Sequence, residues 1–569
     1  MAGHHYTQHN STSQEKMSLE QHPSTHPADI TLRYIIIVGI FLLPLVSLIV
    51  ADHLFFPFIT GKNFTFRIIV EIITALWLIL ALRDRTALPK SSKLLLAFAV
   101  FIGVIFVSDL LSPNIFKSFW SNYERMEGWV TLAHLFALFL VLCSVMTKKL
   151  WEWLFRISIG VSLILFVYGL FQLKGSLQIH QGSTRIDATI GNSAYLGGYM
   201  LFHVFLALYL LCVYLKEHYG RGNWNIFWPT VYGIAALADV FVLFKTATRG
   251  AEIGLVVGLV CFAAGMAFFE KEHKLLRRAA VGVLVLVFVL GSLFVAGRKS
   301  NFVVGSEALS RLGSFTNELL TFDKTVICNG EMKSRCLLWP VAFQGVKERP
   351  LFGWGQESFN YVFNKYYDPR LYSQEQWFDR THNVFLDWLI AGGVLGLLSY
   401  LSLFLFALYY LWRKSGRFSV VEKSLLTGLF VGYFIHNLTV FDNITSYIMF
   451  TLVLGWVAST VGEVPDNLSK KIITLDSGTK NRVLIPLISV AAVFVLYRVN
   501  VPALLAASDL IFALSPNQNG PVQNLAYFKK ALSYRSLGDA EINEQLVQKT
   551  SQLGGISGAD PKLKNDFLT

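Results

Sequence analysis

Long apolar segments dominate this chain and leave few folds open to it. Segments of about 18 or more residues contain no charged residue or a single one, and a soluble fold cannot bury so many of them. A bilayer core about 30 Å thick requires a helix of about 20 apolar residues, which also satisfies the backbone polar groups in lipid. We therefore predict an all-α, polytopic membrane protein with about 12–13 transmembrane helices. The thirteen candidate spans begin near Tyr34, Phe66, Leu94, Gly128, Trp151, Ala194, Ile226, Gly250, Ala279, Val384, Leu425, Ile444 and Val483.

Composition excludes several other classes of protein. Of the 569 residues, 54% are apolar and 15% are charged, which fits neither a disordered chain nor a secreted globular protein. Five Cys provide no disulfide scaffold and no metal framework. The net charge of +12 would suit a nucleic-acid partner in a soluble protein, but membrane proteins carry this excess in their cytoplasmic loops. We expect membrane lipids around the chain and no nucleic-acid partner.

The distribution of Lys and Arg predicts the orientation in the membrane. With a cytoplasmic N-terminus, the short cytoplasmic loops hold 20 Lys and Arg, and the short outer connections hold eight. Positive residues collect on the cytoplasmic side, so we predict a multi-pass protein of the plasma (inner) membrane with the C-terminus outside. The predicted segments are a flexible cytoplasmic tail (1–32), spans one to nine (33–297), a long extracytoplasmic loop (298–383), spans ten to thirteen (384–499) and an extracytoplasmic C-terminal tail (500–569).

The two tails differ in character. The N-terminal tail contains five of the 13 His, but it has no signal-peptide pattern and no adjacent fold that would fix a metal site. In the C-terminal tail, residues 525–537 and 539–553 have the pattern of two short helices separated by Gly538. One TPR-like helical hairpin cannot bury its own apolar face, so we interpret it as a repeat array that ends after one unit.

Two arginines lie where outer connections meet spans. Arg249 precedes Gly250 and Ala251, and small residues let neighbouring backbones approach closely. Arg185 lies in a segment rich in Gly, Ser, Thr and Asn, whose hydroxyls and N–H groups suit a phosphate. The alternatives are a snorkelling arginine at position 249 and a loop ion pair between Arg185 and Asp187.

Two further outer cations are weaker candidates for phosphate contacts. Arg125 lies between Glu124 and Glu127, and a local ion pair with either carboxylate explains it equally well. Lys62, in the segment Thr60–Asn63, is the weaker of the two candidates.

His382 is the most informative single residue. It ends the long loop, and Thr381 or Asn383 can cap the helix that follows, where an anion is favoured nearby. An imidazole has the protonation range of a general base near neutral pH, and Asp379 or Asp387 could fix its tautomer. The alternative is a loop or capping histidine.

Several reaction types lack their motifs in this sequence. There is no Asp-x-Asp pair, no metal-ligand spacing of His, Cys and carboxylates on the outer side, no P-loop and no G-x-S-x-G elbow. We therefore expect no metal ion and no cofactor. Outward-facing arginines with one histidine in a membrane protein suit a lipid-linked phosphate or pyrophosphate.

The order of these motifs resembles the O-antigen ligase and polymerase superfamily, the Wzy-C family. Seven segments carry the resemblance over roughly residues 57–396, and the flanking spans fit the family's count of about twelve. They are Pro57–Phe64, Tyr123–Gly128, Arg185 to Asn192, Thr248–Gly250, Arg335 to Trp339, Arg349–Gly355 and Asp379–Asn383.

The resemblance implies a metal-independent glycosyltransferase with GT-C-type architecture. Such enzymes move a glycan from undecaprenyl pyrophosphate to a hydroxyl of lipid A-core, of a growing glycan or of a protein, on the outer face of the plasma membrane. By this likeness Arg185 and Arg249 would bind the pyrophosphate, and His382 would assist the acceptor. Asp379, Arg380, Asn383 and Arg335 belong to the same motifs as possible supporting residues.

Other functions remain open from the sequence. A polysaccharide polymerase or a protein O-oligosaccharyltransferase of the same family has nearly the same sequence pattern. A transporter or flippase of a lipid-linked anionic substrate would show repeated, interrupted spans near the midplane, and none is evident. A scaffold that binds a partner through the long loop would leave the arginines without a role.

The cysteines outside the spans suggest a disulfide. Cys328 and Cys336 share the outer loop, and an extracytoplasmic compartment permits oxidation. Cys143, Cys212 and Cys261 lie in apolar runs, and we interpret them as core residues.

The predicted topology can be tested with reporter fusions. A reporter that is active only outside the membrane should be active when fused after Gly355 and silent when fused after Arg417. The reverse pattern would contradict the orientation and every site residue assigned from it.

Overall fold

The computed structural model describes residues 26–181, 184–218, 225–321, 328, 330, 332–373, 376–413, 416–462, 476–554, 565 and 567. Within these residues the fold is all-helical. The longer helices are α2 (Pro27–Leu42), α3 (Thr60–Arg83), α4 (Lys93–Leu110), α6 (Trp129–Val145), α7 (Lys148–Leu173), α8 (Ser193–His218), α9 (Phe227–Lys245), α10 (Arg249–Phe269), α11 (Lys274–Gly297), α17 (Val384–Arg413), α18 (Val420–Asn437), α19 (Ile444–Val461) and α22 (Ile485–Leu514). Shorter helices are α5 (Ile115–Trp120), α12 (Asn301–Val304), α13 (Glu307–Thr321), α15 (Lys333–Glu348), α16 (Phe359–Lys365), α21 (Ser477–Thr479), α23 (Gly520–Ser533) and α24 (Asp539–Gly554).

The predicted polytopic helical class is confirmed. Each of the thirteen predicted spans coincides with a helix, and among the described residues eleven helices are long and apolar enough to cross a membrane. The other two predicted spans are α6, a shorter apolar helix, and α18, which has 18 residues.

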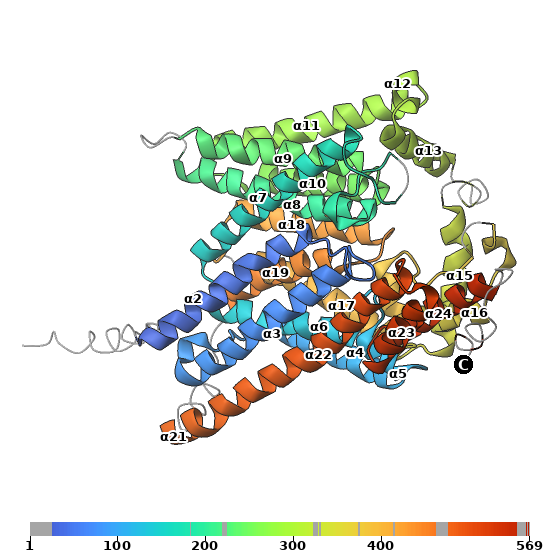
Figure 1. Cartoon of the computed structure of the whole chain (residues 1–569). Helices are drawn as coiled ribbons and strands as arrows, with labels where there is room; N and C mark the ends of the chain where they lie inside the picture. The colour runs from blue at the N-terminus through green and yellow to red at the C-terminus, as the bar shows by residue number, and fades with distance from the viewer. Residues whose placement is uncertain are drawn as a thin grey trace, which may run out of the picture.

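The spans form a bundle with two unlike ends. Figure 1 shows α12, α13, α15 and α16 of the long loop at the same end as the C-terminal helices α23 and α24. The start of α2 and α21 lie at the opposite end. Helices α8 and α19 are central, because most of their side chains are buried. The bundle therefore gathers the segments predicted as extracytoplasmic on one side.

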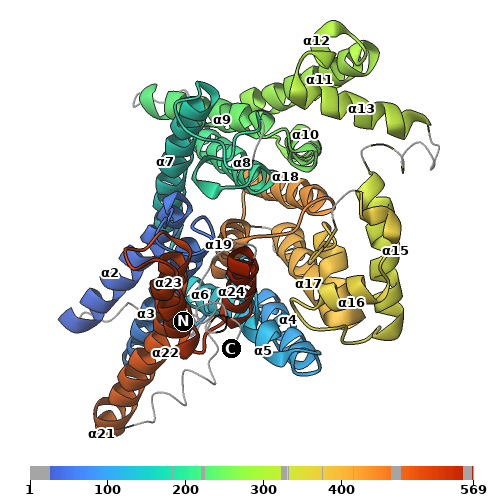
Figure 2. The ribbon, with the colours of Figure 1, turned by 45° about the vertical axis from the view of Figure 1, so that its right-hand side comes forward.

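A close contact between α10 and α18 places the start of α10. The two helices lie side by side in both views (Figures 1 and 2). Glycines line the contact: a Cβ added to Gly254 would lie 2.4 Å from Gly432 O, and one added to Gly258 would lie 2.6 Å from Gly428 O. Small residues permit this backbone approach, as the sequence suggested near Arg249. The beginning of α10 is thereby fixed against the end of α18.

A break in α17 holds the long loop in place. Gly393 has a φ of 62° inside this helix, and Ile390 O accepts a hydrogen bond from Trp354 N at 2.8 Å. A Cβ added to Gly353 would lie 2.3 Å from Ile390 O, and one added to Gly393 would lie 2.3 Å from Leu351 O. Only glycine fits at both positions. The motif at 349–355 is therefore bound by backbone contacts to the first half of α17.

The long loop is itself folded. Helices α15 and α16 and the start of α17 share a separate apolar core, which includes Leu338, Trp354, Phe363 and Leu386. A disulfide joins Cys328 and Cys336, as predicted, with the two Cα atoms 5.5 Å apart. Of the three cysteines assigned to the core, Cys143 and Cys212 are buried, whereas Cys261 is half-buried on α10.

The C-terminal hairpin is covered by an extension of the last span. We predicted that the spans end at residue 499, but α22 continues to Leu514 and packs its apolar side chains on α23 and α24. Ala506 and Leu510 of α22 belong to one buried apolar cluster with Phe528 and Ile542 of the hairpin. Hydropathy marks only the membrane part of a helix, so the sequence did not show this third helix. The hairpin needs no further repeat to bury its apolar face.

The first helix begins within the segment predicted as the N-terminal tail. Residues 1–25, with His4, His5, His9 and His22, lie outside the described residues. Helix α2 begins at Pro27, six residues before the predicted start of the membrane region, and His26 caps it by accepting from Ala28 N. Pro at the first helical position favours this early start.

Candidate active site

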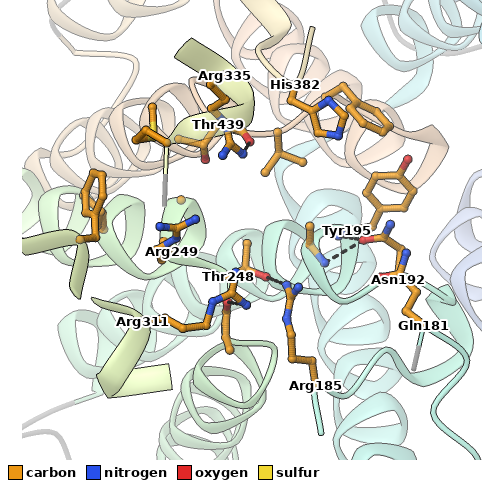
Figure 3. A pocket seen from close by; sticks show the side chains of 18 residues that line it. Gln181, Arg185, Asn192, Tyr195, Thr248, Arg249, Arg311, Arg335, His382 and Thr439 are labelled. Atoms are coloured by element: carbon orange, nitrogen blue, oxygen red, sulfur yellow. Dashed lines mark hydrogen bonds between the residues drawn. The ribbon is translucent and has the colours of Figure 1, made fainter. Parts of the chain in front are cut away.

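A cavity of about 240 Å³ opens at the end of the bundle that carries the long loop. Its walls come from the starts of α8 and α10, from α13 and α15, and from the segments before α17 and after α18. It is lined by Gln181, Arg185, Asn192, Ala194, Tyr195, Ala247, Thr248, Arg249, Gly250, Ile253, Arg311, Phe315, Met332, Arg335, His382, Thr439, Val440 and Phe441 (Figure 3).

Four arginines and one histidine meet in this cavity. Arg185, Arg249 and His382 were predicted as site residues and Arg335 as a supporting residue, and the structure brings these four together. In Figure 3, Arg335 and His382 lie on one side, with Arg185, Arg249 and Arg311 across from them. The guanidinium groups therefore surround the cavity, and the imidazole of His382 lies beside them.

Arg311 and Tyr195 are cavity residues that the sequence reasoning missed. Arg311 lies on α13 one turn before Phe315, and both side chains line the cavity. A helix within a loop packs one face on the bundle, and residues four positions apart lie on the same face. The spacing of Arg311 and Phe315 was therefore the sequence feature that could have indicated Arg311. Tyr195 gave no signal beyond its place at the start of a span.

Two of the arginines are anchored to the turn between α9 and α10. Arg185 donates from Nε to Thr246 O at 2.8 Å and from a terminal nitrogen to Thr248 Oγ1 at 3.2 Å. Arg311 donates to Ala247 O at 3.3 Å. Ala247 has a φ of 47°, a strained value for a non-glycine residue, and such strain collects at functional sites. The turn thus fixes two guanidinium groups on one wall.

The polar segment around Arg185 has a buried carboxylate at its centre. Asp187 is fully buried and accepts from Gln172 Nε2 at 2.7 Å and from His180 N at 2.8 Å. Gly182 and Ser183 of this segment lie outside the described residues. Asp187 therefore folds the segment that presents Arg185.

Thr439 contacts Arg335 and the residue that follows Arg249. Arg249 is the first residue of α10, and its guanidinium lies 5.6 Å from the centre of the Phe315 ring. The next residue, Gly250, has Thr439 so close that an added Cβ would lie 2.1 Å from Thr439 Oγ1. Arg335 on α15 donates to Thr439 O at 2.6 Å. The glycine contact between α10 and α18 therefore sets the distance between these two cations.

His382 is held in an uncommon backbone conformation. Its φ is 57°, and its ring packs edge-on against Phe441 at 5.1 Å and Phe378 at 5.6 Å. Nδ1 lies 3.4 Å from Arg380 O, and a carbonyl can only accept, so this contact favours a proton on Nδ1. Nε2 then carries the lone pair that a base needs.

The cavity keeps His382 neutral well below neutral pH. Burial, together with the nearby charge of Arg335, lowers the pKa of His382 to about 4. An unperturbed imidazole has a pKa of about 6.5. Burial and nearby cations both disfavour the protonated imidazole.

The supporting residues before His382 form ion pairs. Asp379 accepts from Arg125 Nε at 2.6 Å and from a terminal nitrogen of Arg125 at 3.0 Å. Although burial opposes ionisation, the Arg125 guanidinium holds the pKa of Asp379 below its usual value. Arg380 donates to Glu127 at 2.8 Å and to Glu357 at 2.5 Å. These pairs fix the backbone on which His382 sits.

Asn383 caps α17, one of the two capping residues predicted. Its side chain accepts from Phe385 N at 3.0 Å and from Leu386 N at 3.1 Å. Asp387, proposed from the sequence as a partner of the imidazole, instead accepts from Thr381 N at 2.8 Å and Thr381 Oγ1 at 2.7 Å. The described contact at Nδ1 of His382 is thus a backbone carbonyl rather than a carboxylate.

Lys62 and Arg125 lie outside the cavity. The Lys62 ammonium is buried and donates to Ile49 O and Phe58 O at 2.8 Å each and to Thr189 O at 2.7 Å. Three carbonyl oxygens accept its three hydrogen bonds, so Lys62 stabilises the local fold. Arg125 binds Asp379 and Glu124, which makes it part of the framework behind His382.

No group of three or more His, Cys, Asp and Glu is placed to hold a metal ion within the part of the chain that the structure describes. Positive charge in the cavity comes from side chains that stay protonated at all accessible pH values. Guanidinium groups bind phosphate oxygens bidentately, so the arrangement can hold a phosphate or pyrophosphate.

One comparison with known proteins matches part of this chain. Residues 234–401 match the family model Wzy_C, described as O-antigen ligase. The matched region contains Arg249, Arg311, Arg335 and His382, and Arg185 precedes it. The resemblance drawn from the sequence motifs is thereby confirmed. A search of curated proteins finds no match to the chain.

The neutral state of His382 can be tested without an activity assay. Diethyl pyrocarbonate reacts with neutral imidazole, so the modification rate of His382 should fall only as pH drops through about 4. The rate is measured by peptide mass spectrometry at each pH. In Arg335→Met the midpoint should move upward, because a nearby positive charge is removed. A midpoint near 6.5 in both proteins would contradict the lowering of the His382 pKa by burial and by Arg335.

Proposed function

We propose that the chain, whose residues 234–401 match the O-antigen ligase family model, moves a glycan from undecaprenyl pyrophosphate to an acceptor hydroxyl on the outer face of the plasma membrane. The family match supports an enzyme of the ligase and polymerase type. The observation that carries the proposal is the single cavity that holds Arg185, Arg249, Arg311, Arg335 and His382.

The arginines suit the pyrophosphate of the donor. A pyrophosphate presents several oxygens over a few ångströms, and guanidinium groups on opposite walls can bind both phosphates at once. Negative charge grows on the bridging oxygen as the sugar leaves, and fixed donors stabilise that charge without reorganisation. Removal of one such donor commonly costs about 3–4 kcal/mol of transition-state stabilisation.

An apolar cavity beside the arginines suits the lipid chain. It has a volume of about 650 Å³, lies between α10, α11 and α13, and shares Ile253 with the arginine cavity. Apolar side chains of α11, such as Phe288, are exposed, and an apolar surface of this kind suits contact with a polyprenyl chain. The head group would therefore bind the arginines while the chain stays in the hydrocarbon layer. The apolar lining includes Phe244, Val256, Val257, Val287, Leu290, Phe294, Phe302 and Leu309.

The reaction follows from the two kinds of side chain. The acceptor hydroxyl oxygen attacks the anomeric carbon, and the bond from that carbon to the pyrophosphate oxygen breaks. The electron pair leaves with the lipid pyrophosphate, whose charge the arginines stabilise, and the hydroxyl proton passes to Nε2 of His382. One direct displacement inverts the anomeric centre. No metal ion is needed in this scheme.

The acceptor defines the variants of this function. A ligase would use a lipid A-core hydroxyl, a polymerase a growing glycan, and a protein O-oligosaccharyltransferase a Ser or Thr. All three use the same donor site, so the cavity favours none of them. A transporter must move its substrate between the two ends of the bundle, whereas the cavity lies at one end.

Substitution should separate donor binding from transfer. In Arg249→Lys, donor binding and transfer should both weaken, by up to about 10²-fold, because an ammonium cannot reproduce the planar guanidinium fork. In His382→Ala, the donor should still bind while transfer falls by about 10²–10⁴-fold, the usual effect of losing a general base. Both are measured with purified protein, by equilibrium binding of the lipid donor and by initial rates of glycan transfer.

Matched controls come from exposed residues. Arg370→Lys, in a surface pair with Asp368, and His53→Ala, on an exposed turn, should leave both quantities unchanged. A chelator should also have no effect on the rate. Near-normal transfer by His382→Ala would exclude the imidazole as base and direct attention to Glu124 and Glu252. Loss of transfer on chelation would contradict the metal-free scheme.

A deletion strain distinguishes this function from the transporter. Loss of the chain should abolish glycan attachment and leave the lipid-linked precursor on the outer leaflet. Precursor trapped on the inner leaflet would contradict a transferase. The molecule that loses its glycan identifies the acceptor.

A further inference from the structure

Glu541 ties the C-terminal hairpin to the turn at residues 122–128. Its side chain is buried near the start of α24, and it accepts from Tyr123 N at 2.8 Å and from Glu124 N at 3.0 Å. A carboxylate that binds two successive N–H groups fixes both their spacing and their orientation. The turn lies more than four hundred positions away in sequence, so this contact is a specific tertiary link.

Tyr123 strengthens the same link. It is fully buried, and its hydroxyl donates to Ala503 O in α22 at 2.7 Å. Its ring lies under Gly538, where an added Cβ would be 1.8 Å from the ring. Only glycine at the hairpin corner lets the hairpin close over the tyrosine. The hairpin therefore contacts the turn both through the Glu541 side chain and through the close packing of Gly538 on the Tyr123 ring.

The turn at residues 122–128 also binds Asp379 and Arg380, which precede His382. Arg125 donates to Asp379 at 2.6 and 3.0 Å, and Arg380 donates to Glu127 at 2.8 Å. Two successive residues of the segment 379–382 are thus each bound to the turn. The Arg125 guanidinium also lies 4.9 Å from the centre of the Phe441 ring, which packs on the imidazole.

The turn and His382 both contain strained backbone. Met126 has a φ of 54° and His382 a φ of 57°, values that non-glycine residues seldom adopt. Such conformations persist only where the surroundings over-determine them. The ion pairs and the hairpin are the surroundings that the structure provides.

We propose that the C-terminal hairpin is a positioning element for His382, and that Glu541 is its principal positioning residue. The hairpin acts through the turn at 122–128 and its two ion pairs, and Glu541 itself does not reach the cavity. The inference rests on the proposed function, because it assigns the hairpin a role in aligning the base with the acceptor. An error of about 1 Å in the place of a catalytic group can cost about 10²-fold in rate.

The test compares Glu541→Ala with Glu544→Ala, which removes an exposed carboxylate from the same helix. Glu541→Ala should lower kcat for transfer by about 10–100-fold and leave the donor KM unchanged, since the arginine cavity is not touched. Glu541→Gln keeps one acceptor oxygen and should restore part of the rate. Glu544→Ala should behave as wild type. A purely structural hairpin would not separate kcat from KM.

Hydrogen–deuterium exchange provides a readout that does not depend on the enzymatic assignment. In Glu541→Ala, amides of 122–128 and of 379–383 should exchange faster, while those of α10 and α18 keep wild-type rates. Exchange that changes only in α23 and α24, or an unchanged kcat, would overturn the proposal. If wild-type protein transfers no glycan, the proposed function fails, and the exchange data still decide whether the hairpin holds the 379–383 segment. If Glu541→Ala does not fold, Glu541→Gln carries both measurements.

Discussion

Repulsion between like charges is the constraint on which this site depends. Guanidinium groups gather in one cavity only if the surrounding backbone holds them there. Arg185, Arg311 and Arg335 each donate to a main-chain carbonyl in the turn after α9 or in the segment after α18. The glycine contact between α10 and α18 keeps those two segments adjacent. Cations held in this way are pre-organised for an anionic ligand, because little reorganisation remains when it binds.

A second layer of contacts holds the imidazole. Arg125 and Arg380 bind carboxylates behind His382, and the backbone contact of Gly353 with α17 brings the long loop to the same place. The bundle thus separates two tasks. Backbone carbonyls hold Arg185, Arg311 and Arg335 at the cavity, and buried ion pairs fix the segment that contains His382. Loss of one partner in a buried pair leaves an uncompensated charge, so these pairs also make the loop conformation specific.

The sequence predicted much of this structure, because hydropathy and charge determine membrane spans. Residue types at the ends of spans also indicated Arg185, Arg249 and His382 as site residues, because charged or polar side chains at these positions suit a polar ligand. Sequence spacing does not reveal the partner of a cation, so Lys62 appeared equivalent to Arg185 although its donors bind three carbonyls. Arg311 was missed because its helix lies in a loop, and its position depends on tertiary packing.

The position of the pyrophosphate tests the central claim most directly. A cryo-electron microscopy structure of the chain with undecaprenyl pyrophosphate bound would show it. We expect both phosphates within hydrogen-bond distance of Arg185 and Arg249, with the lipid chain between α10 and α11 and Nε2 of His382 facing the free side of the phosphates. Phosphates beside Lys62 and Arg125, or a lipid chain on another face of the bundle, would contradict the assignment of the cavity as the donor site.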